Sequence, residues 1–376
     1  MIYLDYNATA PIRPEVFDAM KPYLVEEWGN PSSTYAFGSK LKAVIEEARG
    51  HLATLIGAAT RDIVFTGSAT ESNNSALNAA LKAQSQKKHI ITSQVEHSAI
   101  LNHVAALEAS GYRVTKLGVN EEGLIDLGEL NDAINDDTAM VSLMWANNET
   151  GVLFPVEEIG RLCRQRNVLF HCDAVQAVGK IAVDLKSQPI DYLSLSAHKI
   201  GGPKGVGALF VRKNVPFTPF IYGGHQERGR RGGTENVASL VGFGRAAQLA
   251  RAEIEGYSKL VRPLRDKLET SVITQIAQAE INGHLIDRLA NTSNITFFGV
   301  ESEAILLLLD QKGICASAGS ACLADSDEPS HVVRAMKPNS GASRQMVRFS
   351  LGAHSTLNEI ELTVRALKEI ISNLRR

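Results

Sequence analysis

The chain has 376 residues, of which 44% are hydrophobic and 21% charged, and these are ordinary values for a globular protein. A formal net charge of −2 gives no reason to expect nucleic acid or an anionic membrane as a partner. No apolar run approaches the roughly 20 residues that span a bilayer. No secretory signal is expected at the N-terminus. The length favours one large and one small domain.

Segments with strand character alternate with segments of helical periodicity in the first two thirds of the chain. Strands are expected at residues 62–66, 89–92, 113–117, 139–144, 168–172 and 192–196. Helices are expected at residues 71–83, 99–109 and 156–166. This alternation predicts an α/β fold with a mostly parallel, doubly wound sheet. Residues 206–211 follow the preceding strand too closely for a helical crossover, so we expect that strand to be antiparallel.

The last third of the chain predicts a second, smaller α+β domain. A long helix near residues 238–267 leads into it, and its further elements are two strands, at 293–298 and 346–351, and two helices, at 302–309 and 357–374. We expect a large domain at 15–255 and a small domain formed by 1–14 and 256–376. Residues 318–328 are rich in Gly, Ser, Ala and Asp, and they are the segment that we expect to be least ordered.

Lys199 and Asp173 lie directly after two of the expected strands. Lys199 stands between the strand 192–196 and the glycine-rich turn 201–205, and Asp173 ends the strand 168–172. A lysine that forms an imine and an acid that holds a pyridinium nitrogen are what pyridoxal phosphate (PLP) needs from its protein. Open α/β sheets bind ligands at the carboxyl ends of their strands. Alone, each residue has an ordinary structural interpretation, but the pair predicts a PLP site.

Residues 66–74 join a strand to a helix through small side chains. Backbone N–H groups at the start of a helix form a ready phosphate site, and Thr70 adds a hydroxyl. The alternative is an ordinary helix N-cap in which Thr70 bonds to Asn73. The chain has no Walker A pattern and no convincing G-x-G-x-x-G at a helix start, so nucleotide binding is disfavoured.

Five further polar residues lie near strand ends on the same expected edge: His97, Asn148, Gln176, Ser196 and His198. Ser196 and His198 can donate to a phosphate, and His97 can stack on a planar ring. Asn148 and Gln176 can form hydrogen bonds to the hydroxyl of that ring. Each is a weak signal alone, but their shared position favours one common site.

Cys322 lies in a segment of small residues, which suits a nucleophile that moves between a site and a partner. An incidental thiol is the alternative. We expect Cys163, Cys172 and Cys315 to be buried or structural. No two cysteines have C-x-x-C spacing, so neither a disulfide framework nor a zinc site is predicted, and a reducing cytoplasm is the expected location.

Arg348 lies between Val347 and Phe349 in an expected strand, so its side chain alternates with apolar ones. Arginine binds a carboxylate in a bidentate manner, and Arg348 is therefore a candidate for binding a substrate carboxylate. A surface salt bridge is the alternative.

The chain closely resembles the cysteine desulfurases of the nitrogen-fixation and iron–sulfur-cluster type, which belong to the class-V aminotransferase family. The resemblance covers essentially the whole chain and rests on motifs at residues 3–11, 67–74, 96–97, 147–149, 173–176, 196–205, 223–229, 231–234, 320–322, 328–336 and 347–352. Ala10 and Ala197 replace a usual Thr and Gly, which puts little in doubt. The tip 323–327 is more acidic than usual and leaves the choice of partner open.

The resemblance implies a homodimeric, fold-type-I PLP enzyme without a resident metal. It implies conversion of L-cysteine to L-alanine, with a persulfide left on Cys322 and passed to an iron–sulfur scaffold or another sulfur acceptor. By the same resemblance Lys199 forms the Schiff base, Asp173 pairs with the pyridine nitrogen, and His97 stacks on the ring and acts as acid and base. Arg348 would bind the substrate carboxylate.

The other site residues implied by the resemblance surround the cofactor and the substrate. The phosphate and cofactor ligands would be Ala69, Thr70, Ser196, His198 and, from the second subunit, Thr234. Asn148 and Gln176 would contact the ring, and Asn7 and Asn148 the substrate. The long segment that follows Cys322 resembles the subgroup with an extended loop.

Two other function classes stay open. A related PLP enzyme without persulfide chemistry, such as a selenocysteine lyase or an aminotransferase, would not need Cys322. A catalytically idle homologue with a binding or regulatory role is disfavoured by the presence of Lys199, Asp173 and Cys322 together.

Overall fold

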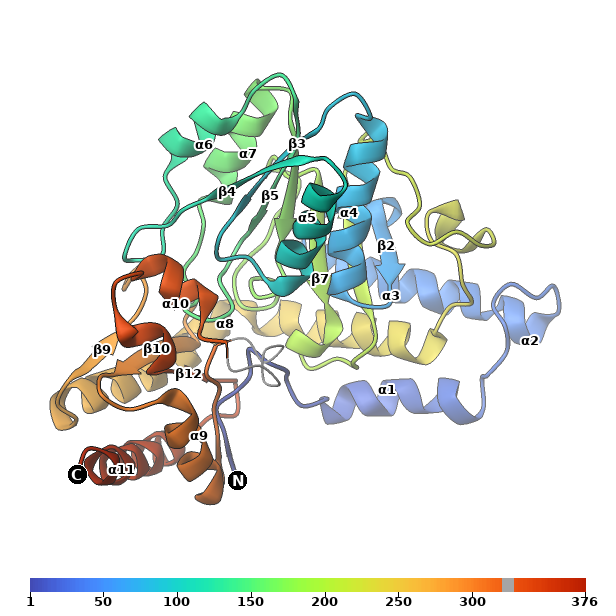
Figure 1. Cartoon of the computed structure of the whole chain (residues 1–376). Coiled ribbons are helices and arrows are strands. Elements are labelled where there is room, and N and C mark those ends of the chain that lie inside the picture. Colours follow the sequence, from blue (N-terminus) through green and yellow to red (C-terminus); the bar gives the residue numbers. More distant parts are fainter. Residues whose placement is uncertain (320–327) are drawn as a thin grey trace.

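The computed structural model describes residues 1–319 and 328–376 (Figure 1). Its larger sheet has the strand order β2 (Ile63–Thr66), β8 (Gly207–Val211), β7 (Tyr192–Ser196), β6 (Leu169–Asp173), β5 (Thr138–Met144), β3 (His89–Ser93) and β4 (Arg113–Leu117). Strand β8 is antiparallel to both of its neighbours, and the other pairs are parallel. The predicted α/β class, the mostly parallel sheet and its antiparallel strand are therefore confirmed.

Helices cover both faces of this sheet, as a doubly wound fold requires. One core packs α4 (Ala69–Ala83) and α5 (Ser98–Ala109) against side chains such as Val64, Ile90 and Met140. The other core packs α3 (Leu41–Leu55), α7 (Val156–Gln165) and α8 (Val237–Gln275) against the next residue of the same strands. Successive strand residues point to opposite faces, so nearly continuous apolar strands supply both cores. The short helix α6 (Leu127–Ala133) precedes β5.

A smaller region is built around a second, antiparallel sheet. It contains the strands β9 (Ala279–Ile281), β10 (Thr292–Phe297) and β12 (Met346–Ser350), and the helices α9 (Ser302–Gln311), α10 (His331–Met336) and α11 (Leu357–Leu374). The N-terminal strand β1 (Ile2–Tyr3) pairs in parallel with β11 (Ile314–Cys315). We propose the domain boundaries given above, because a separate apolar core unites Leu4 with the C-terminal half of α8 and with α11.

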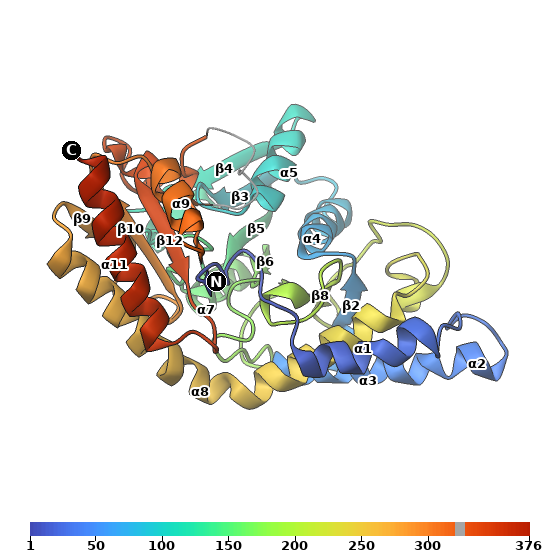
Figure 2. The same cartoon turned by 90° about the horizontal axis from the view of Figure 1, so that it is seen from below.

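Helix α8 extends beneath both sheets (Figure 2). It is longer than predicted, because it continues past Lys267 to Gln275. Two more helices, α1 (Pro14–Val25) and α3, pack against it, although no element was predicted before residue 62; a short α2 (Ala36–Ser39) lies between them. Among the described residues, no helix is long and apolar enough to cross a membrane.

Candidate active site

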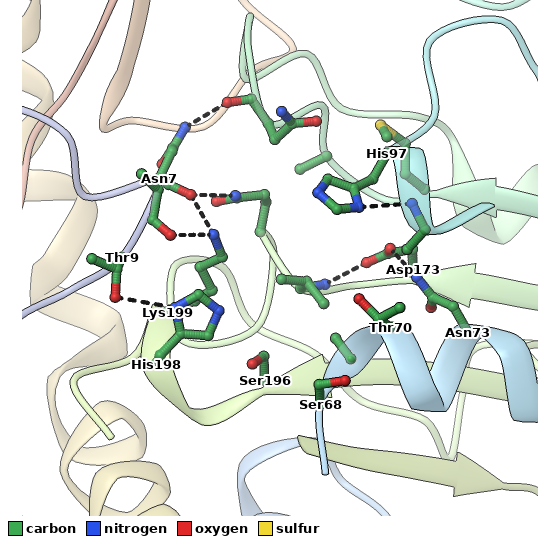
Figure 3. A pocket seen from close by; sticks show the side chains of 18 of the residues that line it. Asn7, Thr9, Ser68, Thr70, Asn73, His97, Asp173, Ser196, His198 and Lys199 are labelled. Carbon is green, nitrogen blue, oxygen red and sulfur yellow. Dashed lines mark hydrogen bonds between the residues drawn. The ribbon is translucent and has the colours of Figure 1, made fainter. Parts of the chain in front are cut away.

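A cavity of about 470 Å³ lies at the carboxyl edge of the parallel strands (Figure 3). The ends of β3, β5, β6 and β7 meet there, together with the start of α4, the N-terminal segment and β12. The structure brings to its wall all the predicted site residues except two: Asn7, Ala69, Thr70, His97, Asn148, Asp173, Gln176, Ser196, His198, Lys199 and Arg348. The two exceptions are Thr234 and Cys322.

Asp173 is the last residue of β6 and is buried. Its Oδ2 accepts a hydrogen bond of 2.7 Å from Asn73 Nδ2, and its Oδ1 accepts one of 3.1 Å from the backbone N–H of Val175. Asn73 comes from α4, so this contact joins the helix to the strand end (Figure 3). These two hydrogen bonds orient the carboxylate at the wall of the cavity, where it could pair with a pyridinium nitrogen.

Lys199 lies in the one-turn 3-10 segment Ala197–Lys199 that follows β7. Its Nζ donates to the backbone oxygens of Asn7 at 2.5 Å and of Ala8 at 2.7 Å. Both acceptors belong to the N-terminal segment, which therefore crosses the cavity next to the lysine (Figure 3). The amine is thus available on the same wall as the Asp173 carboxylate.

The start of α4 forms the small-residue turn predicted to bind phosphate. The predicted N-cap alternative is wrong in its residue, because Ser68 caps the helix and its Oγ accepts from the Glu71 backbone N–H at 3.1 Å. Thr70 is the second residue of the helix and lines the cavity. A Cβ on Gly207 would lie 2.5 Å from the Ser68 carbonyl carbon, so β8 approaches this turn as closely as only glycine allows.

His97 is the N-cap of α5, and its Nδ1 accepts a hydrogen bond of 3.1 Å from the Ala99 backbone N–H. A neutral ring in this arrangement carries its proton on Nε2. His198 pairs through Nδ1 with Thr9 Oγ1 at 3.1 Å. Burial, and then the nearby Lys199 and Lys204, lower the pKa of His198 to about 4, so this ring is neutral at pH 7.

Arg348 is almost fully buried, so the surface salt-bridge interpretation is wrong. Its guanidinium contacts Asp5 Oδ1 at 2.6 Å and donates to the backbone oxygen of Asn148 at 3.1 Å. Asp5 Oδ2 in turn accepts from Ser317 Oγ at 2.9 Å. Arg348 Nε and Asn148 Oδ1 are buried without a hydrogen-bond partner among the described residues. The cavity wall therefore has one donor and one acceptor that a ligand could bind.

Thr234 is exposed and does not line the cavity of its own chain. It follows a segment that is held to helices α3 and α4 by two arginine–carboxylate pairs. Arg49 binds Glu227 at 2.6 and 2.8 Å, and Arg231 binds Glu71 at 2.9 and 3.1 Å. Glu71 also accepts from the Gly67 N–H at 2.7 Å, so the segment before Thr234 is tied to the phosphate turn.

Cys322 lies outside the residues that the structure describes. Cys163 and Cys172 are buried in the large region, as predicted, and Cys315 is only partly buried. Burial raises the pKa of the Cys163 thiol to about 12, and it raises the pKa of Cys172 well above its usual value. Neither thiol has the accessible, readily ionised character of a nucleophile.

Four residues that shape the site were not predicted as site residues from the sequence: Asn73, Asp5, Glu96 and Lys180. Asn73 could have been found, because it lies four residues after Ala69 and therefore on the same helix face. Each of the other three has a contact with a distant segment that the sequence does not show: Asp5 with Arg348, Glu96 with Met144, and Lys180 with Asn7.

The residues on the cavity wall fit PLP. An amine, a buried carboxylate, a helix N-terminus and two unpaired buried polar atoms surround one space, and its volume is within the usual range for a small-molecule site. Lys199 would bind the aldehyde carbon, Asp173 the ring nitrogen, and the start of α4 the phosphate.

Comparison with known proteins gives one consistent result. The family model of aminotransferase class V matches residues 2–363. A protein of Nostoc sp. named cysteine desulfurase is 50% identical over 375 residues, which cover 100% of this chain and 94% of that protein. A solved NifS-like protein has a TM-score of 0.93 at 35% identity, with 99% of each chain covered. A solved structure of SspA in complex with cysteine has a TM-score of 0.82 at 34% identity, with 95% of this chain and 100% of that chain covered. The chain therefore belongs to the class-V aminotransferase family and, within it, to the PLP-dependent cysteine desulfurases.

Proposed function

We propose that this protein removes sulfur from L-cysteine, releases L-alanine and transfers the sulfur to an acceptor for iron–sulfur cluster assembly or a related use. The observation that carries the proposal is the placement of Lys199 and of the Asn73-bound Asp173 at adjacent strand ends, facing one cavity with the start of α4. Its sequence relatives are named for the same reaction. When bound, PLP supplies a sink for the electron pair released at the substrate Cα.

Lys199 would attach the cofactor and would exchange a proton with the substrate Cα. Its Nζ must be neutral at the stage when it accepts that proton. Asp173 would hold a proton on the ring nitrogen, and Asn73 orients the carboxylate for this role. His97 would stack on the ring and would move protons through Nε2, because its Nδ1 accepts from the Ala99 backbone N–H.

Ala69, Thr70, Ser196 and His198 bind the phosphate group. The helix start supplies backbone N–H groups, and His198 donates as a neutral ring rather than as a cation. Thr234 would complete this site in a second copy of the chain, which makes the protein a homodimer. Its exposure and its absence from its own chain's cavity support this role.

Arg348 binds the carboxylate of L-cysteine. Asp5 and the Asn148 backbone oxygen fix its guanidinium plane, and its Nε remains available. Asn148 and Gln176 contact the ring, and Asn7 and Asn148 complete the substrate side. A fixed, bidentate donor selects an α-amino acid over an amine that lacks the carboxylate.

Cys322 accepts the sulfur, on the evidence of its sequence context. Its thiolate attacks Sγ of the bound substrate, the Cβ–Sγ bond breaks, and an S–S bond forms on the enzyme. The carbon skeleton gains a proton at Cβ and leaves as alanine, so L-cysteine and one thiol give alanine and one persulfide. The high pKa values of Cys163 and Cys172 disfavour them as alternatives. We propose a cytoplasmic location on the basis of the unpaired cysteines.

The activity test uses purified protein saturated with PLP. L-cysteine should change the absorbance of the bound cofactor and give alanine and, with a thiol reductant, sulfide in a 1:1 ratio. L-serine, which has the same skeleton without sulfur, is the control. A requirement for a keto-acid acceptor would support an aminotransferase instead. Alanine formed only from selenocysteine would support a selenocysteine lyase.

The sulfur acceptor is tested by mass spectrometry after brief exposure to L-cysteine. The peptide that contains Cys322 should gain one sulfur atom, and the Cys322→Ser protein should still bind L-cysteine but release almost no alanine. Cys315→Ser is the matched control, because Cys315 is the partly accessible cysteine among those that the structure describes. Sulfur on Cys315, or full turnover by Cys322→Ser, would contradict the assignment.

A further inference from the structure

Lys180 is a buried lysine that the proposed chemistry does not use. It lies in the turn after β6, four residues beyond Gln176, and its side chain is enclosed by the protein. Its Nζ donates to Gln176 Oε1 at 2.7 Å and to Asn7 Oδ1 at 2.9 Å. Among residues 1–319 and 328–376, no carboxylate forms an ion pair with it.

A lysine buried in this position lowers the stability of the folded protein. An ammonium group that leaves water without an anionic partner loses several kcal/mol of hydration that two amide oxygens only partly replace. Burial, and then the positive charges of Lys199 and Arg348, lower the pKa of Lys180 well below its usual value. A methionine would fill the same space without this cost. The nitrogen itself must therefore serve a purpose, and its only described partners are the two amides.

The Gln176 amide is held in one orientation from both ends. Its Oε1 faces Lys180, and its Nε2 donates to the Asn7 backbone oxygen at 2.9 Å. A carbonyl can only accept, so the amide end next to Asn7 must be nitrogen. That NH₂ group has a second N–H, and Gln176 lines the cavity. Because the oxygen faces Lys180 and the nitrogen faces Asn7, the second N–H is the group that this side chain can offer to the cavity.

The Asn7 amide is fixed in the same way. Its Oδ1 accepts from Lys180 and, at 3.0 Å, from Asn291 Nδ2. Its Nδ2 donates to the Asn148 backbone oxygen at 3.1 Å and to Thr292 Oγ1 at 2.9 Å. The backbone oxygen of the same Asn7 accepts from Lys199 Nζ. Lys180 thus holds the segment against which the reactive amine rests.

We propose that Lys180 is a positioning residue that orients the Gln176 amide, so that the side chain presents an N–H donor to the cofactor's ring oxygen and stabilises that oxygen as an anion. The inference rests on the proposed function, because it takes Gln176 as a ring-side ligand of PLP. Without Lys180, the amide oxygen loses its donor, and the orientation that offers N–H to the cavity is held only by the hydrogen bond from Nε2 to the Asn7 backbone oxygen.

The first test is a double-mutant cycle in PLP binding, measured by titration of the cofactor-free protein. Lys180→Met should weaken PLP binding about tenfold, which is the effect of losing one well-placed hydrogen bond. Gln176→Leu should weaken it by a similar factor. If Lys180 acts through Gln176, adding Lys180→Met to Gln176→Leu should cause no further loss. The exposed Lys186→Met is the matched control. If Lys180→Met weakens PLP binding by the same factor in the wild type and in Gln176→Leu, the proposal is overturned.

The second test is spectroscopic. In Lys180→Met the pH midpoint of the bound cofactor's absorbance change should rise, because an anionic ring oxygen is less favoured without the donor. A merely structural role would not move this midpoint. If Lys180→Met does not fold, Gln176→Glu replaces it, since this variant keeps Lys180 and gives it a carboxylate. Gln176→Glu has no N–H donor and should also bind PLP about tenfold more weakly; wild-type affinity would overturn the proposal.

The outcomes distinguish failure of the proposed function from failure of the role of Lys180. Wild-type protein that binds no PLP and does not act on L-cysteine would refute the proposed function. Wild-type protein that does both, with Lys180→Met equal to it in affinity and in absorbance midpoint, would refute the role of Lys180 alone.

Discussion

Glu96 should make the stability of this protein depend on pH in a direction opposite to that of most carboxylates. It directly precedes His97, and its side chain is fully buried. Its Oε1 accepts from Ser93 Oγ at 2.7 Å and from the Met144 backbone N–H at 3.0 Å, and its Oε2 has no partner among the described residues. Burial outweighs these two hydrogen bonds and raises the pKa of Glu96 from 4.5 to about 8.

The raised pKa means that the folded protein keeps a proton that the unfolded chain releases. Between the unfolded value of 4.5 and the folded value of about 8, the folded state binds more protons, so stability falls as pH rises. The slope for one such group is about 1.4 kcal/mol per pH unit. From pH 5.5 to 7.5 the free energy of unfolding should fall by about 2.7 kcal/mol on account of Glu96.

The Glu96→Gln substitution isolates this effect. An amide keeps an oxygen for Ser93 and Met144 and cannot ionise, so the variant should gain about 2.7 kcal/mol relative to the wild type over the same pH range. Urea unfolding of both proteins under identical cofactor conditions measures the difference, and other titrating groups cancel. As a control, Glu121→Gln changes an exposed carboxylate, and its free energy of unfolding should change with pH as that of the wild type does. A constant difference between wild type and Glu96→Gln from pH 5.5 to 7.5 would refute the reasoning.

Four further outcomes are expected. Lys199→Ala should lose turnover and the absorbance of covalently bound PLP while retaining part of the affinity; full activity would refute its role. Asn73→Ala removes the donor to the buried carboxylate at the end of β6 and should weaken PLP binding about tenfold or more in a titration, and unchanged affinity would argue against that contact. Arg348→Lys keeps the charge without the bidentate geometry and should raise KM for L-cysteine more than it lowers kcat; the reverse pattern in steady-state kinetics would contradict substrate binding. Arg49→Met leaves Glu227 buried without its cation and should cost about 3–5 kcal/mol in urea unfolding, whereas a loss below about 1 kcal/mol would show the pair to be dispensable.

The elements of the large sheet could be predicted because their sequence signals are local. Strands β4 and β7 have the predicted bounds, since each is a β-rich run between turn residues. The proposed PLP pair could be singled out for the same reason, because Asp173 ends β6 and Lys199 lies three residues after the end of β7. The sequence shows which residues lie at strand ends, and the parallel sheet brings those residues close together at one edge.

The two long helices before residue 62 differ in how clearly the sequence marks them: α3 has helical apolar spacing at Leu41, Ile45, Leu52 and Leu55 and could have been found, whereas α1 has no single apolar stripe. In α1, Phe17, Leu24 and Val25 are exposed while Val16 and Met20 are buried, so the apolar residues do not form one stripe. In α3 the buried face includes Arg49, whose charge is matched by Glu227, far away in sequence. Only the tertiary partner explains a buried arginine there.

The cofactor site depends on both regions of the fold, and this gives ligand binding a structural consequence. Asn7 and Arg348 come from the N-terminal segment and β12, whereas Asn148 and Lys199 come from the large sheet. Contacts such as Arg348 to the Asn148 backbone oxygen and Lys199 to the Asn7 backbone oxygen cross between them. A cavity whose walls belong to two regions exists only while they are docked, so a ligand that fills it must stabilise the docked arrangement by the free energy of its binding. In the proposed roles, a substrate carboxylate bound by Arg348 and a cofactor bound by Lys199 would therefore strengthen one and the same interface.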